Sequence, residues 1–162
     1  MDIEQIKRIK ELAVIAMFSD DELLNILVLK GGSAIDMFLQ SPGRASLDLD
    51  FSIDGDFHED VESLRNKFER LLSESFGPEN FIVFDVRFKA IPSADVIELP
   101  FWGGYTLEFK IAPPQIYEKY KDKLHKLRGK HATDIGPGQL KTFCYRFQQA
   151  RILCRKGKTR TR

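Results

Sequence analysis

The order of apolar and polar residues along the chain predicts helices and strands in alternation. Apolar residues recur at helical spacing in 2–17 and in 59–76, so both segments are predicted to be amphipathic helices. Apolar and polar residues alternate one by one in 81–89 and in 105–111, which is typical of strands with one buried face.

Shorter segments fill the space between these elements. A capping box that starts at Ser19 predicts a second helix as far as about Ile26. The apolar segment 27–30 is predicted to be a short strand or a helix end, and the acidic segment 46–53 a strand. A double proline ends the last of the alternating strands, and the lysine-rich segment 115–128 is predicted to be a helix.

A glycine turn follows the apolar segment 27–30 and is the first candidate for chemistry. Gly31 and Gly32 form the turn, and Ser33 caps a predicted helix behind it. Such a turn holds phosphate oxygens on its backbone N–H groups, and the dipole of the helix adds to the attraction. We therefore expect these residues to bind the phosphates of a nucleotide.

Two aspartates on the acidic strand are the second candidate. Asp48 and Asp50 are two residues apart, so their side chains point to the same face of a strand. Two neighbouring carboxylates repel each other, and a divalent cation relieves that repulsion. Mg²⁺ or Mn²⁺ bound there would bridge phosphate oxygens. Together, the turn and the aspartates predict a nucleoside-triphosphate site in a metal-dependent transferase.

Both blocks, in this order, resemble the DNA-polymerase-β-like nucleotidyltransferase superfamily, in particular its AbiEii-type abortive-infection branch. That branch carries a Gly-Gly-Ser/Thr turn and then an Arg-x-Ser-x-Asp-Leu-Asp-Phe strand. The matching residues in this chain are Gly31, Gly32, Ser33, Arg44, Ser46, Asp48, Leu49, Asp50 and Phe51. The resemblance extends from about Leu24 to about Leu140.

The resemblance implies a fold and a function. The fold is α/β (α+β), of the polymerase-β-like nucleotidyltransferase type, with a mixed β-sheet flanked by helices. A nucleotidyltransferase domain spans 1–142, and 143–162 is an atypical basic tail. The implied enzyme transfers a nucleoside monophosphate from NTP to a hydroxyl of RNA, such as tRNA, or of a protein. It would be the toxin of a toxin–antitoxin or phage-defence system, and a cognate antitoxin is an expected partner.

The resemblance also assigns the site residues. The expected metal ligands are Asp48 and Asp50. The expected catalytic residues are Asp48, Asp50, Lys110 and Glu108. The expected nucleotide-binding residues are Lys30, Gly31, Gly32, Ser33, Arg44 and Ser46. Arg44 suits either a phosphate contact or a pair with an aspartate. Alternating charge on a strand is also typical of a solvated face. Glu108 and Lys110 are therefore either catalytic residues or exposed surface residues.

The chain departs from the family where a third carboxylate is expected. The family has a strand of Ile-Asp-x-Ser-Lys type after a Gly-Pro-rich turn, whereas the residues after that turn here are Phe143, Cys144, Tyr145, Arg146 and Phe147. Two explanations remain: a natural short variant that uses Glu108 as its third acid, or a truncated or frameshifted product. Without a third acid, the alternative function is a catalytically inactive nucleotide-binding or protein-interaction domain.

A one-base frameshift near Phe143 is compatible with the sequence. Residues 143–150 can be encoded by TTT TGC TAT CGA TTT CAG CAA GCA, and the same bases read one position later encode Phe-Ala-Ile-Asp-Phe-Ser-Lys. This hypothesis would account both for the missing acid and for the basic tail.

Composition and charge agree with one compact domain. The 162 residues are 43% hydrophobic and include 13 Phe, which is enough to fill a single core.

The charge is distributed unevenly along the chain. Residues 1–134 carry a net charge of −7, whereas 135–162 carry +8. The basic tail is either a segment that attracts RNA or DNA, or a disordered or foreign terminus. We find no apolar run of membrane-spanning length and no signal peptide, so a cytoplasmic protein is expected.

Overall fold

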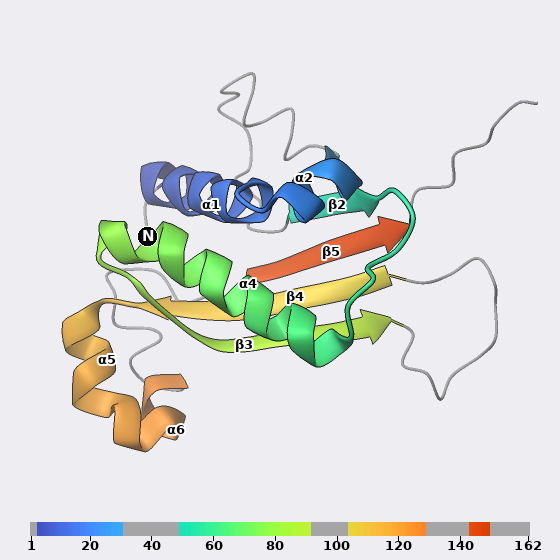
Figure 1. Ribbon diagram of the computed structural model, residues 1–162. Coiled ribbons are helices and arrows are strands. Elements are labelled where there is room, and N and C mark those ends of the chain that lie inside the picture. Colours follow the sequence, from blue (N-terminus) through green and yellow to red (C-terminus); the bar gives the residue numbers. More distant parts are fainter. Residues whose placement is uncertain (1–2, 31–48, 92–103, 129–142, 150–162) are drawn as a thin grey trace, which may run out of the picture.

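A sheet of five strands orders the structure, with its strands in the sequence β1-β2-β5-β4-β3 (Figure 1). The computed structural model describes residues 3–30, 49–91, 104–128 and 143–149, the last of these by its backbone. The strands are β1 (Leu27–Lys30), β2 (Leu49–Ile53), β3 (Ile82–Ile91), β4 (Gly104–Ala112) and β5 (Phe143–Gln149).

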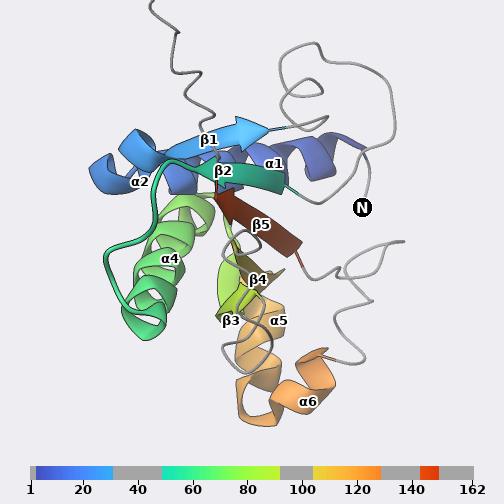
Figure 2. The ribbon, with the colours of Figure 1, turned by 90° about the vertical axis from the view of Figure 1, so that its right-hand side faces the viewer.

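The sheet is mixed, as the sequence predicts. β2 and β5 run parallel, and the other neighbouring strands run antiparallel. β5 comes last along the chain but lies between β2 and β4 (Figure 2). The first 7 residues of the predicted tail 143–162 therefore form an inner strand of the sheet. The rest of that tail lies outside the described residues.

Two long helices cover one face of the sheet (Figures 1 and 2). They are α1 (Ile3–Phe18) and α4 (Val61–Phe76), in agreement with the two amphipathic segments predicted from the sequence. The short α2 (Asp21–Ile26) leads from α1 into β1. The sequence prediction of a mixed sheet flanked by helices is thus confirmed.

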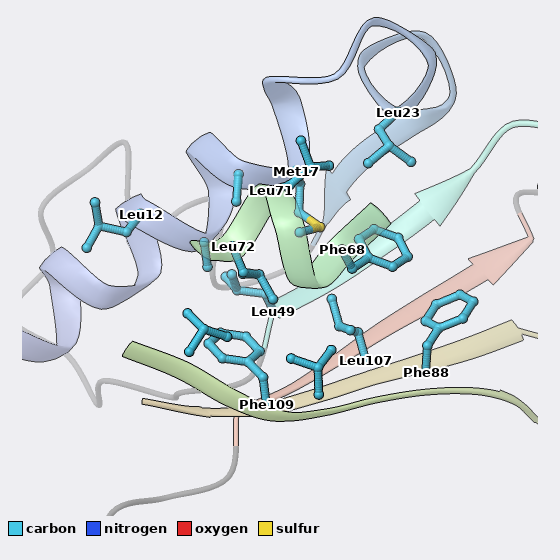
Figure 3. Packing of buried hydrophobic residues seen from close by; sticks show 14 of the residues in the cluster. Leu12, Met17, Leu23, Leu49, Phe68, Leu71, Leu72, Phe88, Leu107 and Phe109 are labelled. Atoms are coloured by element: carbon cyan, nitrogen blue, oxygen red, sulfur yellow. The ribbon is translucent and has the colours of Figure 1, made fainter. Parts of the chain in front are cut away.

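The core lies between these helices and the sheet (Figure 3). Phe68 on α4 is fully buried, and its ring lies 5.0 Å from that of Phe88 on β3 and 6.1 Å from that of Phe57. Burying one such ring contributes about 1.5–3 kcal/mol. The sheet presents Leu49, Leu107 and other apolar residues to the same cluster. This packing fixes which face of each strand is left for polar residues.

The start of α2 differs from the prediction. The N-cap is Asp20, whose carboxylate accepts hydrogen bonds from the backbone N–H groups of Glu22 and Leu23, each at 3.1 Å. Ser19 instead donates its hydroxyl to the carbonyl of Ala16, at 2.9 Å. The predicted capping box at Ser19 is therefore wrong. Aspartate is at least as good a cap as serine, and it stands one residue closer to the helix.

β3 departs from simple alternation at Asp85. The pairing with β4 shifts between Phe84 and Arg87, and Asp85 has a positive φ of 57°. As a result, Val86 and Phe88 face the main core, while Phe84 packs in a second cluster with Ala112 and Leu127. The sequence pattern placed Phe84 on the same face as Val86. The extra residue of a β-bulge reverses that assignment.

The predicted helix at 115–128 is interrupted. The observed elements are α5 (Pro114–Tyr120), the short 3-10 turn η2 (Lys121–Lys123) and α6 (Leu124–Lys126). Tyr120 and Lys123 both have backbone angles outside the helical range, which breaks the run. Because of the breaks, Tyr117, Tyr120 and Leu124 can all pack against the second cluster, beside Phe84 and Ala112.

Candidate active site

The face of the sheet opposite α1 and α4 carries polar residues. On β2, Leu49, Phe51 and Ile53 are buried in the main core, so alternation places Asp50 and Ser52 on the opposite face. The Asp50 side chain is exposed there. This matches the sequence argument that an aspartate of the acidic strand points away from the apolar residues.

Antiparallel pairing brings the end of β1 next to Asp50. Lys30, the last residue of β1, is the direct partner of Asp50 in the ladder. Direct partners in an antiparallel pair have Cα atoms about 4.5–5.5 Å apart and side chains on the same face. Gly31 follows Lys30 immediately in the sequence. In the sequence, the predicted glycine turn thus begins directly after the residue that pairs with Asp50.

Asp50 belongs to a row of paired residues that crosses the whole sheet. The row runs through Lys30, Asp50, Arg146, Thr106 and Lys89. Neighbouring strands lie about 4.8 Å apart, so each step along the row is of that size. Both register neighbours of Asp50 are thus cationic residue types. The sequence gives no sign of this, because Arg146 is paired with Asp50 only through the order of strands.

Glu108 lies one row away from Asp50. It pairs with Cys144 on β5 and with Arg87 on β3, and it shares a face with Thr106. The offset is two strands sideways and two residues along the strand. In a flat sheet this separates the Cα atoms of Glu108 and Asp50 by about 12 Å. Glu108 is therefore on the predicted face, but it is not a direct neighbour of Asp50.

Lys110 lies farther along β4 and forms an ion pair. Its ammonium nitrogen, Nζ, is 3.2 Å from Oδ2 of Asp85, and only 17% of the Lys110 side chain is exposed. From Thr106 to Lys110 the strand advances by about 14 Å. The structure thus joins Lys110 to the bulge of β3, on the side of β4 that faces away from β2.

Asp85 is the centre of a cationic cluster that the sequence analysis missed. Arg128 donates two hydrogen bonds to its carboxylate, at 3.0 Å from Nε and 2.6 Å from Nη2. Nη2 of Arg87 lies 3.5 Å away, and 7% of the Asp85 side chain is exposed. Burial raises the pKa of Asp85, but the bonds to Arg128 and Lys110 outweigh it, so the pKa lies below its ordinary value. The available signal was the unbroken apolar run from Ile82 to Phe84, which strict alternation does not produce.

Ser52 is a further residue on the face of Asp50. Its hydroxyl is buried and has no hydrogen-bond partner within the described ranges. Buried hydroxyls normally have a partner. A polar group, of the protein or of a ligand, is therefore expected beside this part of β2.

Several predicted site residues lie outside the described residues. These are Gly31, Gly32, Ser33, Arg44, Ser46 and Asp48. The structure describes Lys30, Asp50, Glu108 and Lys110, and of these it brings Lys30 and Asp50 together.

The described residues by themselves do not fit a divalent cation. No group of three or more His, Cys, Asp or Glu side chains comes together within 3–30, 49–91, 104–128 and 143–149. Asp50 is also flanked in register by Lys30 and Arg146. A hard cation prefers several oxygen ligands, and cationic neighbours oppose its binding. The second carboxylate of the predicted pair, Asp48, is not among the described residues.

The sequence also matches a known family. A family model described as nucleotidyl transferase AbiEii toxin, type IV toxin–antitoxin system, matches residues 13–135. The chain belongs to the AbiEii family. It is therefore a member of a family of toxin–antitoxin nucleotidyltransferases. A comparison with curated proteins finds no match.

The match to the AbiEii family covers the predicted site but not the whole sheet. Every predicted site residue, from Lys30 to Lys110, falls within 13–135, whereas β5 lies beyond it. The resemblance noted from the glycine turn and the acidic strand is thereby confirmed at the level of the family. Among the described helices, none combines the length and apolar character needed to cross a bilayer.

Proposed function

We propose that this AbiEii-family chain binds a nucleoside triphosphate at the glycine turn and the acidic strand. With Mg²⁺ or Mn²⁺, it would transfer the nucleoside monophosphate to a hydroxyl of RNA, such as tRNA, or of a protein. The proposed role is that of a toxin that acts in the cytoplasm and is neutralised by a cognate antitoxin.

The observation that carries this proposal is the pairing of Lys30 with Asp50. Residues that are distant in sequence, at the start of the glycine turn and on the acidic strand, become direct neighbours on one face of the sheet. Phosphate binding by the turn and metal binding by the aspartates need such proximity, because one triphosphate has to contact both. The family match supports the same reading.

Each residue has a proposed part in the reaction. Backbone N–H groups of Gly31 and Gly32 would hold the phosphates, and the Lys30 ammonium would offset their negative charge. Asp48 and Asp50 would hold the metal ion, which supplies charge neutralisation for phosphoryl transfer when bound. Holding the phosphates and the acceptor hydroxyl in place accounts for much of the rate in this kind of reaction.

The remaining predicted residues have supporting parts. Ser33, Arg44 and Ser46 would add contacts to the nucleotide. Glu108 would accept the proton of the acceptor hydroxyl. Its place on the same face as Asp50 supports this role, although the two residues are not direct neighbours. Lys110 would act near the acceptor or the triphosphate, and its ion pair with Asp85 would hold it in place.

A second function is an inactive nucleotide-binding or protein-interaction domain. The pairing of Arg146 with Asp50 favours this alternative. A cationic residue type stands there in one of the two register positions beside the aspartate, and the acid of β4, Glu108, is not a direct neighbour of Asp50. Nucleotide would then bind, and transfer would be weak or absent.

Labelled nucleotides distinguish the two functions. The chain is incubated with each α-labelled NTP, Mg²⁺ and total tRNA, beside the Glu108→Gln variant and the double variant Asp48→Asn with Asp50→Asn. Label that is transferred by the parent chain and lost in both variants would support the enzyme with Glu108 as its third acid. Label retained in Glu108→Gln would assign that acid elsewhere. Bound but untransferred NTP would support the binding domain.

A further inference from the structure

We propose that Arg87 and Arg128, oriented by Asp85, form a second anion site that binds a phosphate group through their guanidinium groups. The proposed function gives these two arginines no part. The site does not depend on that function, because anion binding can be measured without a metal ion and without transfer.

An excess of exposed positive charge is the first argument. Three cationic groups contact the carboxylate of Asp85, which lies 3.2 Å from Nζ of Lys110, 2.6 Å from Nη2 of Arg128 and 3.5 Å from Nη2 of Arg87. The register also places Glu108 beside Arg87, so three cationic and two acidic residues leave a net charge of +1. Asp85 is only 7% exposed, whereas Arg87 and Arg128 are 51% and 43% exposed. The charge that the cluster around Asp85 presents to an approaching anion is therefore mainly that of the two arginines.

Unused hydrogen-bond donors are the second argument. Arg128 donates to Asp85 from Nε and Nη2, and none of the described residues accepts a bond from its Nη1. Arg87 approaches Asp85 with Nη2 alone. A guanidinium carries five N–H donors in a planar fork that matches phosphate oxygens. Both arginines thus keep donors for a ligand while they contact the aspartate.

The spacing of the two arginines is the third argument. Nη2 of Arg128 and Nη2 of Arg87 both contact Oδ1 of Asp85, at 2.6 and 3.5 Å. Their separation is at most the sum of these two distances, about 6 Å. Two N–H···O bonds of about 2.9 Å that share one oxygen span nearly as far. One phosphate group can therefore contact both guanidinium groups.

The fold orients both arginines before a ligand arrives. Asp85 stands at the bulge of β3 with a positive φ of 57°. Leu127 is fully buried in the second cluster beside Phe84, which fixes the chain directly before Arg128. Side chains that are already ordered lose less conformational entropy on binding. Asp85 is thus a positioning residue of the anion site and not one of its ligands.

The anion site lies apart from the predicted nucleotide site. Arg87 pairs with Glu108 and so shares the face of the sheet that carries Asp50. The row through Asp50 reaches β3 at Lys89, two residues from Arg87. In a flat sheet, three strand steps and two residues separate the Cα atoms of Asp50 and Arg87 by about 16 Å. A phosphate held by Arg87 is thus not one that contacts Asp50, and it comes from a free phosphate or mononucleotide or from a nucleic-acid backbone.

The first experiment measures binding of inorganic phosphate without metal ion and at constant ionic strength. The readout is the broadening of its phosphorus NMR signal at about pH 7.5, where phosphate is mostly dianionic. Arg87→Gln should weaken binding about threefold and Arg128→Gln at least about fivefold, because each removes a charged donor. Arg128→Lys should still bind about threefold more weakly than the parent chain, because an ammonium group cannot bind in a bidentate way.

A matched control and two further ligands complete the design. Arg70→Gln removes the same charge from an arginine of α4 that is 56% exposed and also paired with a carboxylate, and it should change affinity less than about twofold. Labelled AMP and a labelled single-stranded RNA of about ten nucleotides are then compared by fluorescence anisotropy. If the phosphate belongs to a nucleic acid, Arg87→Gln with Arg128→Gln should weaken RNA binding at least about tenfold and reduce its salt slope by about 1 to 2. If it belongs to a mononucleotide, AMP binding should fall and RNA binding should not change.

Several results would overturn the proposal. They include no phosphate binding by the parent chain, and equal binding of all three ligands by the parent chain and both arginine variants. An equal loss in Arg70→Gln would show a general effect of net charge. Loss of phosphate binding in Gly32→Val, with binding kept in both arginine variants, would place the anion at the glycine turn. If Arg128→Gln does not fold by circular dichroism, Arg87→Gln decides, because its exposed ion pair contributes little to stability.

Discussion

Replacing Asp85 by asparagine should destabilise the fold through loss of charge. The Asp85 carboxylate binds Arg128 at 2.6 and 3.0 Å and Lys110 at 3.2 Å. Asparagine has nearly the same size and, like aspartate, tolerates the positive φ of 57° at this bulge. The substitution therefore leaves the backbone unstrained, removes the negative charge and replaces one acceptor oxygen with an NH₂ donor. Lys110 loses the charged partner that holds it beside the bulge of β3.

The magnitude follows from the burial of each partner. The pair with Lys110 counts most, because the side chains are 17% and 7% exposed. Hydrogen bonds to charged groups contribute about 1.5–3 kcal/mol when they are shielded from water. Arg128 and Arg87 are 43% and 51% exposed, so each adds less than about 1 kcal/mol. We expect Asp85→Asn to lower the free energy of unfolding by about 2 kcal/mol, and the melting temperature by about 4–8 °C.

Urea denaturation at pH 7 and at pH 3 tests this reasoning. The pKa of Asp85 is lowered in the fold, so its stabilisation is complete above the unfolded pKa of about 3.9 and is lost as the pH falls through the folded pKa. The difference between the parent chain and Asp85→Asn should therefore be full at pH 7 and smaller at pH 3. Arg87→Gln, which removes the most exposed partner, should cost less than about 0.5 kcal/mol. The expected role of Asp85 would be refuted if Asp85→Asn lowered the free energy of unfolding by less than about 0.5 kcal/mol at pH 7. It would also be refuted if the difference from the parent chain did not shrink at pH 3.

Three further predictions concern the site and the core. Gly32→Val should weaken NTP binding at least tenfold, about 1.4 kcal/mol, in a calorimetric titration, because a β-branched residue opposes close approach of phosphate. Mg²⁺ with NTP should raise the melting temperature of the parent chain, but not that of Asp48→Asn with Asp50→Asn. Burial and a 2.7 Å hydrogen bond to Asp56 raise the pKa of Tyr105 to about 12, so its hydroxyl stabilises the fold below about pH 10 and loses this effect as the pH rises through 12. Tyr105→Phe should cost about 1 kcal/mol at pH 7, and urea denaturation should show this cost shrinking at alkaline pH.

The sequence predicts the long helices well because each helix contains many apolar residues at helical spacing. In α4, five buried residues recur at helical spacing, and Asp60 caps the first turn. The prediction began at residue 59, two residues before the observed start at Val61. The exact start of a helix depends on single side chains. For that reason, the sequence also places the N-cap of α2 at Ser19, whereas the observed N-cap is Asp20.

The sequence predicts less where one residue alters a pattern. The positive φ of Asp85 moves Phe84 to the other face of β3, and nothing in the alternation of Phe84 with Val86 and Phe88 indicates it. The interruption of 115–128 has a similar origin. Lysine-rich helical spacing continues through the segment, but the helix is broken and Tyr117 and Tyr120 pack against the cluster of Phe84.

The candidate site illustrates the difference between local and long-range information. The sequence related the glycine turn to Asp50 through the order and spacing of the two motifs, and the structure pairs Lys30 with Asp50. The pairing of Arg146 with Asp50 could not be predicted, since it depends on strand order: β5 follows β3 and β4 along the chain but lies between β2 and β4.

This long-range neighbour lies outside the part of the chain that the family match covers. A motif search sees the turn and the aspartates, both of which fall within the AbiEii match at 13–135. The charge around Asp50, however, also depends on β5, which lies beyond that match. The residue types beside Asp50 are therefore set partly by a strand that neither motif contains.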